Sequence, residues 1–206
     1  GSIVPISMGS NILCQGTYAL LDDIVKYFPS PENLKIAGFN MKTNDVFEAN
    51  YRKVLSEIKE KTNAKIVMLE PFLLHAPEKE YFRVDLNPKI DIVRKLAKEF
   101  AVNIVAGSVA NIRDGRLYNT AMVFDRTGSC IASYDKTHLF TPMGEDKAFE
   151  KCDHLCRFTL DGVSCGLIIC YDLRFPELSR ALALNGMQLL FAVSQWPDVR
   201  ISHLTA

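Results

Sequence analysis

The chain has 206 residues, enough for one sizeable domain or two small ones. Its 24 Lys and Arg residues balance 24 Asp and Glu residues, so it lacks the basic field that steers proteins to nucleic acid, and no nucleic-acid partner is expected. No apolar run approaches the ~20 residues that span a bilayer, and six cysteines without a signal peptide indicate a cytoplasmic protein with free thiols and no membrane partner.

The first predicted elements form a β-α-β unit behind a short leading segment. A strand at 3–7 precedes an amphipathic helix at 18–28, which two prolines terminate. Beyond them, the pattern predicts a strand at 34–41, a helix at 47–62 with apolar residues on one side, and a buried strand at 64–72.

The next elements are a second helix and a hairpin. The apolar stripe of 87–101 predicts an amphipathic helix that leads into a strand at 102–110. The β-rich runs 117–125 and 130–140 are joined by "RTGS", and this glycine-bearing turn predicts a hairpin.

The last elements surround a cysteine. The stretch "HLCRFTLDGVSCGLIICYD" (154–172) predicts another hairpin with "DG" at its turn. A helix at 177–185, closed by Gly186, then precedes an apolar strand at 187–194. Taken alone, Cys170 would be read as a small core hydrophobe. Its place between a buried strand and a charged turn instead predicts an open strand-to-helix corner that exposes a nucleophile.

Residues 102–206 carry a set of motifs that resembles the carbon–nitrogen hydrolase (nitrilase) superfamily. The motifs are "VAGSVAN", "DGRLYNTAMVFDRTG", "YDKTHLF", "MGED", "CGLIICYDLRFPEL" and "SQWPDVRISH". The resemblance implies an α/β fold, the α-β-β-α sandwich. It also makes the final residues the start of a helix that leads to further strands, so the sandwich is expected to be incomplete at the C-terminus.

The resemblance implies a catalytic triad. Cys170 would be the nucleophile, Lys136 the oxyanion stabiliser and Glu70 the base, although the proline beside Glu70 follows it where the family has it before. The chemistry also follows from the residue types. A thiol is nucleophilic as the thiolate and needs a base or a nearby cation, while a fixed cation stabilises the oxyanion of an attacked amide.

Four further residues are assigned to substrate binding or positioning. The resemblance makes Glu145 a second glutamate near the lysine. The backbone N–H of Tyr171 is expected to be a second oxyanion donor, because Tyr171 follows the nucleophile. Arg174 and Trp196 are the other two residues assigned to substrate binding or positioning. Neither a cofactor nor a metal is predicted. Cys152, His154 and Cys156 form a C-x-H-x-C cluster, but structural zinc usually takes four ligands and alternation would place these three on one strand face.

Two other segments resemble different families. Residues 34–101 resemble the middle of SGNH (GDSL-type) esterases, without that family's serine, aspartate and histidine motifs, and are alternatively a divergent nitrilase front end. Residues 1–33 are similar to part of elongation factor G-like GTPases, but no P-loop is present, so GTP binding is not predicted. The sequence therefore suggests a mosaic of three segments, 1–33, 34–101 and 102–206.

The leading functional prediction is hydrolysis of a carbon–nitrogen (amide) bond in a small molecule through a cysteine thioester. The first alternative is a non-catalytic chimeric or truncated chain that carries an incomplete nitrilase half-site. The second is an SGNH-type esterase. A homo-oligomer is left open.

Overall fold

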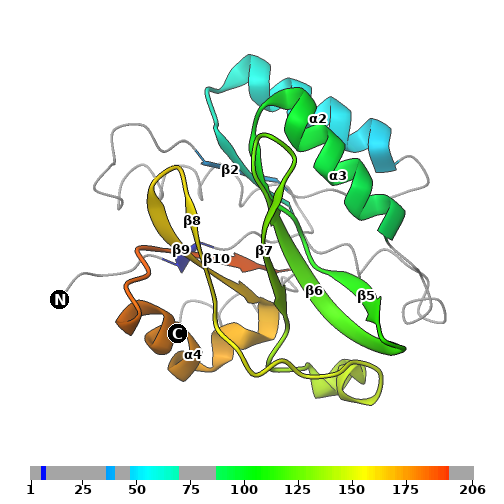
Figure 1. The fold of residues 1–206 in the computed structure, drawn as a ribbon, viewed down its shortest axis with the longest axis vertical. Helices are drawn as coiled ribbons and strands as arrows, with labels where there is room; N and C mark the ends of the chain where they lie inside the picture. The colour runs from blue at the N-terminus through cyan, green and yellow to red at the C-terminus, as the bar shows by residue number, and fades with distance from the viewer. Residues whose placement is uncertain (1–5, 8–35, 40–46, 70–86, 195–206) are drawn as a thin grey trace.

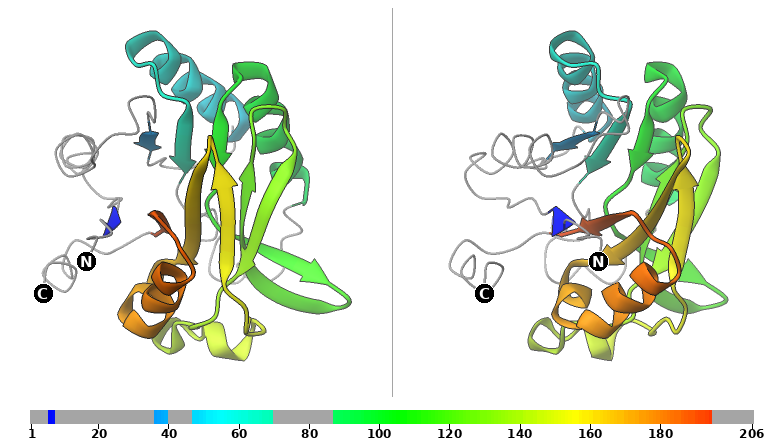
Figure 2. Two further views of the ribbon diagram at one scale, coloured as in Figure 1. Left: turned by 60° about the vertical axis from the view of Figure 1, so that its left-hand side comes forward. Right: turned by 90° about the vertical axis from the view of Figure 1, so that its left-hand side faces the viewer.

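The structure is a computed structural model, and it describes residues 6–7, 36–39, 47–69 and 87–194 (Figure 1). Two β-sheets pack face to face, and helices cover both outer faces, as the two further views in Figure 2 show. The predicted helix at 18–28 lies outside the described residues.

Six strands of the first sheet lie in the described residues. They are β2 (Ile36–Phe39), β3 (Ile66–Leu69), β4 (Asn103–Val105), β5 (Val109–Arg113), β6 (Arg116–Phe124) and β7 (Cys130–Asp135). Strands β2, β3 and β4 are parallel, β6 is antiparallel to β4, and β7 is antiparallel to β6. Strands β3 and β7 therefore run in the same direction and end at the same edge of the sheet. The sheet also combines strands from both predicted segments, 34–101 and 102–206.

In the part of the chain that the structure describes, the second sheet has four strands in the order β1 (Ile6–Ser7), β10 (Leu189–Val193), β9 (Val163–Ile169) and β8 (Cys156–Leu160). Strands β1, β10 and β9 are parallel, and β8 is antiparallel to β9. Burial of β9 and β10 on both faces explains why their sequences read as nearly continuous apolar runs.

Three apolar cores hold the layers together. Between the sheets, Val123 and Tyr134 of the first pack with Leu167 and Phe191 of the second. The helices α2 (Phe47–Lys61) and α3 (Asn87–Phe100) cover the outer face of the first sheet, and α4 (Pro176–Leu184) covers that of the second. The predicted α-β-β-α sandwich is confirmed. No helix within the described ranges is long and apolar enough to cross a membrane.

The predicted "DG" turn at 161–162 and a second Asp-Gly pair at 114–115 adopt the same backbone conformation. Asp114 and Gly115 have φ angles of 52° and 73°, and Asp161 and Gly162 have 48° and 82°. Two successive positive φ angles match the twist of a tight hairpin, and Asp-Gly is the pair that tolerates them best. The hairpin of β8 and β9 is confirmed, as is the end of α4, where Gly186 has a φ of 83°.

The predicted strand at 102–110 is interrupted. Ile104 pairs with Phe124 and Val105 with Val123, but the next pair after them joins Val109 to Thr120. Val109 thus lies four residues after Val105, whereas their partners in β6 are three residues apart. One extra residue in one of two paired strands is a β-bulge. The strand predicted at 130–140 is also shorter than expected, because β7 ends at Asp135 and Lys136 begins a loop.

Candidate active site

Cys170 sits at a strained corner. Strand β9 ends at Ile169, and Cys170 begins a short 3₁₀ helix, η4 (Cys170–Arg174), with a φ of 45°. Non-glycine residues rarely adopt a positive φ, and such strain is concentrated at functional positions. The half-buried side chain packs against the core between the sheets. The predicted strand-to-helix corner is therefore present.

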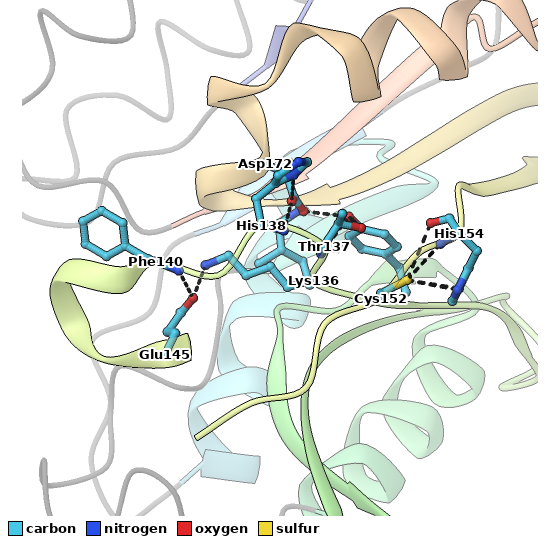
Figure 3. A network of polar contacts seen from close by, with 10 residues as sticks. Lys136, Thr137, His138, Phe140, Glu145, Cys152, His154 and Asp172 are labelled. Carbon is cyan, nitrogen blue, oxygen red and sulfur yellow. Dashed lines mark hydrogen bonds and ion pairs between the residues drawn. The ribbon is translucent and has the colours of Figure 1, made fainter. Parts of the chain in front are cut away.

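Asp172 ties this corner to the loop after β7. Its fully buried carboxylate accepts hydrogen bonds from the backbone N–H of Ile169 (3.0 Å) and the hydroxyl of Tyr134 (2.8 Å) on Oδ2. On Oδ1, it accepts the backbone N–H of His138 (2.8 Å) and lies 2.8 Å from the Nδ1 atom of the same residue (Figure 3). Tyr134 and His138 flank Lys136 by two residues on each side, so one carboxylate holds Cys170 and Lys136 in the same neighbourhood.

Lys136 and Glu145 form a buried ion pair. The Nζ atom of Lys136, a residue only 2% exposed, donates to Oε2 of Glu145 at 2.7 Å. The same oxygen accepts the backbone N–H of Phe140 at 2.7 Å, so two donors converge on the carboxylate in Figure 3. Glu145 reaches the lysine from η3 (Glu145–Lys147), which follows a tight turn at Gly144 with a φ of 74°. A buried cation fixed in this way is suited to stabilising an oxyanion.

The neighbouring acidic residue has its own partners. Asp135 accepts hydrogen bonds from Arg113 and from the hydroxyl of Thr120. Because these groups satisfy Asp135, the Nζ atom of Lys136 pairs with Glu145 rather than with its chain neighbour.

Aromatic rings surround the corner. The ring of His138 stacks on that of Phe175, with centroids 3.6 Å apart. The ring of Tyr171 lies edge-to-face with Phe140 at 5.0 Å and with Phe175 at 5.3 Å. All four side chains are partly exposed, and Tyr171 directly follows Cys170 in η4, so this aromatic cluster adjoins the cysteine corner.

The predicted site residues lie partly in the described structure and partly outside it. Cys170, Tyr171 and Arg174 lie in η4, and Arg174 is exposed at its end. Glu70 and Trp196 lie outside the described residues. The roles of all these residues, and those of Lys136 and Glu145, stay predictions.

The cluster around Cys152 does not have the expected geometry. Strand β8 begins at Cys156, so the expectation that Cys152, His154 and Cys156 share one strand face is wrong. The Sγ atom of Cys152 lies 3.0 Å from Nδ1 of His154 instead. In the part of the chain that the structure describes, no group of three or more His, Cys, Asp or Glu side chains is placed to hold a metal ion.

Three contributors were not identified from the sequence as part of the site. They are Asn119, which donates to Glu145, and Tyr134 and His138, which bind Asp172. Asn119 and Tyr134 lie within the motifs "LYNT" and "YDKTH", but their spacing from Glu145 and Asp172 gives no signal of contact.

The fold and site thus define an α-β-β-α sandwich in which one buried carboxylate links a cysteine corner to the loop that bears a buried lysine–glutamate pair. The sequence model of the family Carbon-nitrogen hydrolase matches residues 35–204, and the chain belongs to this family. The match includes most of the segment 34–101, whereas 1–33 lies outside it. The resemblance to the nitrilase superfamily is confirmed.

Several curated proteins are similar to the chain. It is 42% identical over 122 residues to "Hydrolase in agr operon" of Staphylococcus lugdunensis, which covers 58% of this chain and 52% of the relative. It is 40% identical over 111 residues to "2-oxoglutaramate amidase" of Bacillus subtilis (strain 168), covering 54% and 43%. It is 31% identical over 172 residues to "Omega-amidase NIT2" of Homo sapiens, covering 77% and 62%. The chain spans about half the length of the first two relatives.

Solved structures share the fold. An amidase from Nesterenkonia sp. superposes with a TM-score of 0.71 at 21% identity, and the match covers 82% of this chain and 68% of the other. The carbon-nitrogen hydrolase from Helicobacter pylori G27 gives a TM-score of 0.70 at 19% identity, covering 84% and 65%. At these identities the likeness concerns the fold.

Proposed function

We propose that the protein hydrolyses a carbon–nitrogen bond of a small amide through a thioester on Cys170. The observation that carries this proposal is the placement of one buried carboxylate, Asp172, between the strained cysteine corner and the loop that bears Lys136. A nucleophile and an oxyanion stabiliser must be held at fixed geometry for acyl transfer, and a buried link between their two segments supports the proposal.

The reaction has two halves. Glu70 removes the thiol proton as Cys170 attacks the amide carbon, and the oxyanion is stabilised by Lys136 Nζ and the backbone N–H of Tyr171. Collapse of the tetrahedral intermediate breaks the C–N bond, and Glu70 returns the proton to the departing ammonia or amine. Water, deprotonated by the same glutamate, then cleaves the thioester to release the carboxylic acid and restore the thiol.

The assignment of Glu70 is supported by the sheet. Strand β3 is described to Leu69 and runs in the same direction as β7, which ends at Asp135. The described ends of these two strands therefore lie at the same edge of the sheet. Glu70 directly follows β3, and Lys136 directly follows β7.

The relatives suggest the substrate class. Two of them are named 2-oxoglutaramate amidase and omega-amidase, so we expect a small amide that carries a carboxylate. The exposed residue Arg174, four residues after the nucleophile, is a candidate partner for that carboxylate. Trp196 is a further candidate for substrate binding. No cofactor enters this chemistry, and we expect a cytoplasmic enzyme, with self-association left to measurement.

We also propose that 34–101 is the divergent front end of this enzyme. The family match includes nearly all of it, and β2 and β3 complete the first sheet. The alternatives are a mosaic origin of the three segments and an SGNH-type esterase. Turnover measurements separate the esterase from the amidase.

The test is ammonia release from a panel of small amides, including carboxylate-bearing ω-amides, beside nitrophenyl ester hydrolysis. The expected result is turnover of at least one amide that disappears in Cys170→Ala. Ester turnover that survives Cys170→Ala would favour the esterase. A folded wild-type chain that releases no ammonia from any amide would favour the non-catalytic alternative.

A further inference from the structure

Asn119 of β6 touches both members of the buried ion pair. Its backbone carbonyl accepts the N–H of Lys136 at 2.8 Å. Its side-chain Nδ2 donates to Oε1 of Glu145 at 3.4 Å, while the other carboxylate oxygen holds the lysine ammonium at 2.7 Å. One residue therefore fixes where the lysine leaves its strand and how the glutamate faces it.

The amide of Asn119 is only half satisfied. The residue is 2% exposed, and within the described part of the chain its Oδ1 is a buried atom without a hydrogen-bond partner. Turning the amide over would not remove the problem, because Oδ1 would then face the carboxylate of Glu145. Buried polar atoms are nearly always paired in folded proteins, and an exception calls for an explanation.

A structural role explains this arrangement poorly. An apolar side chain of similar size would fill this buried position without leaving an unpaired oxygen. Local rules of this kind are broken at functional sites, where geometry matters more than stability.

We propose that Asn119 is a positioning residue for catalysis, which orients Glu145 and through it the Nζ atom of Lys136. The proposal rests on the amidase function proposed above. The Nδ2 donor fixes the rotation of the carboxylate, so Oε2 stays directed at the ammonium that must meet the oxyanion. Without that donor, Oε1 loses its partner and the carboxylate is held through Oε2 alone, by the Phe140 N–H and the ammonium itself, so its rotation about the last torsion is less tightly fixed.

Asn103 offers a matched control. It is also 2% exposed, but both ends of its amide are paired: Nδ2 donates to Asp161 Oδ2 at 3.2 Å, and Oδ1 accepts the N–H of Arg126 at 3.0 Å. Asp161 belongs to the turn before β9, so this cluster lies at the opposite end of that strand from Cys170.

The experiment compares Asn119→Leu with Asn103→Leu in kcat, KM and melting temperature. We expect Asn119→Leu to keep or raise the melting temperature and to lower kcat by roughly 10- to 100-fold with KM little changed, as for other residues that act through a catalytic group. We expect Asn103→Leu to lower the melting temperature and to keep kcat. If Asn119→Leu does not fold, Asn119→Ala is measured in the same way.

Full kcat in either Asn119 variant overturns the proposal, as does a fall in kcat that only accompanies a fall in melting temperature. A second readout needs no turnover and so separates this proposal from the amidase assignment. In a ¹H–¹⁵N spectrum of lysine side chains, the Lys136 ammonium signal, assigned by its loss in Lys136→Met, is expected to shift in Asn119→Leu and not in Asn103→Leu. An unchanged signal in Asn119→Leu also overturns it.

Discussion

The hydroxyl of Tyr134 donates a hydrogen bond to Asp172 across 2.8 Å, and it thereby joins the end of β7 to the turn after β9. Both side chains are completely buried. Burial, followed by the charge of Asp172, raises the pKa of Tyr134 far above its ordinary value, so the phenol stays a donor across the physiological range. The two sheets are therefore locked together where the catalytic residues are proposed to lie.

Tyr134→Phe removes the hydroxyl and keeps the ring. We expect the free energy of unfolding to fall by about 2 kcal/mol, the usual effect of losing a buried hydrogen bond to a charged group. We also expect kcat to fall, because the corner that carries Cys170 loses one of its anchors. Urea unfolding and steady-state kinetics measure both. Tyr118→Phe, in a ring that stacks on Arg113, is the control and should change neither; equal effects of the two variants would contradict the role of Asp172.

Lys136→Met should abolish turnover and also destabilise the fold. It leaves the carboxylate of Glu145 buried without its cation, a change that typically costs about 3–5 kcal/mol. The double variant Lys136→Met/Glu145→Gln removes both charges, so most of the lost stability should return while turnover stays absent. Chemical denaturation of the four proteins in this cycle tests the coupling. A double variant no more stable than Lys136→Met would show that the pair does not account for the loss.

The protein should lose stability in alkali. Burial raises the pKa of Cys156 and of Cys165 to about 12 from the model-compound value of 9.0. Above pH 9 the unfolded chain therefore releases thiol protons that the folded chain keeps, so the free energy of unfolding falls as the pH rises towards 12. Each thiol contributes a slope of up to about 1.4 kcal/mol per pH unit.

Cys165→Ala isolates this effect. The variant loses some stability at every pH because it leaves a cavity. Its free energy of unfolding should nevertheless fall less steeply between pH 9 and 10.5 than that of the wild type. The difference in slope should approach the contribution of one thiol, about 1.4 kcal/mol per pH unit. Parallel curves for the two proteins would mean that Cys165 titrates normally in the fold.

Local patterns predicted much of the fold. The Asp-Gly pair at 161–162 was predicted as a hairpin turn because neighbouring residues alone determine such a turn. The bulge between β4 and β5 was missed. It depends on the pairing of Val109 with Thr120 of the neighbouring strand β6. The residues next to Val109 in the sequence do not predict that pairing.

The sequence proposes residues for the site but not the contacts among them. Cys170, Lys136 and Glu145 stand out because their motifs resemble a family. The links among them could not be predicted, since Asp172 meets partners 34 and 38 residues away, and Asn119 meets Glu145 across 26. Such contacts depend on tertiary packing rather than on spacing.

The most direct test of the central claim is the rate at which each cysteine reacts with iodoacetamide, itself an amide, measured by peptide mass spectrometry after brief treatment. Burial raises the pKa of Cys130 and Cys152, as it does for Cys156 and Cys165, so these thiols should react slowly near neutral pH. We predict that Cys170 is alkylated about tenfold faster or more than any other cysteine, and that an amide substrate protects it. Uniform labelling of the cysteines, or labelling of Cys170 that no amide slows, would contradict its assignment as the nucleophile.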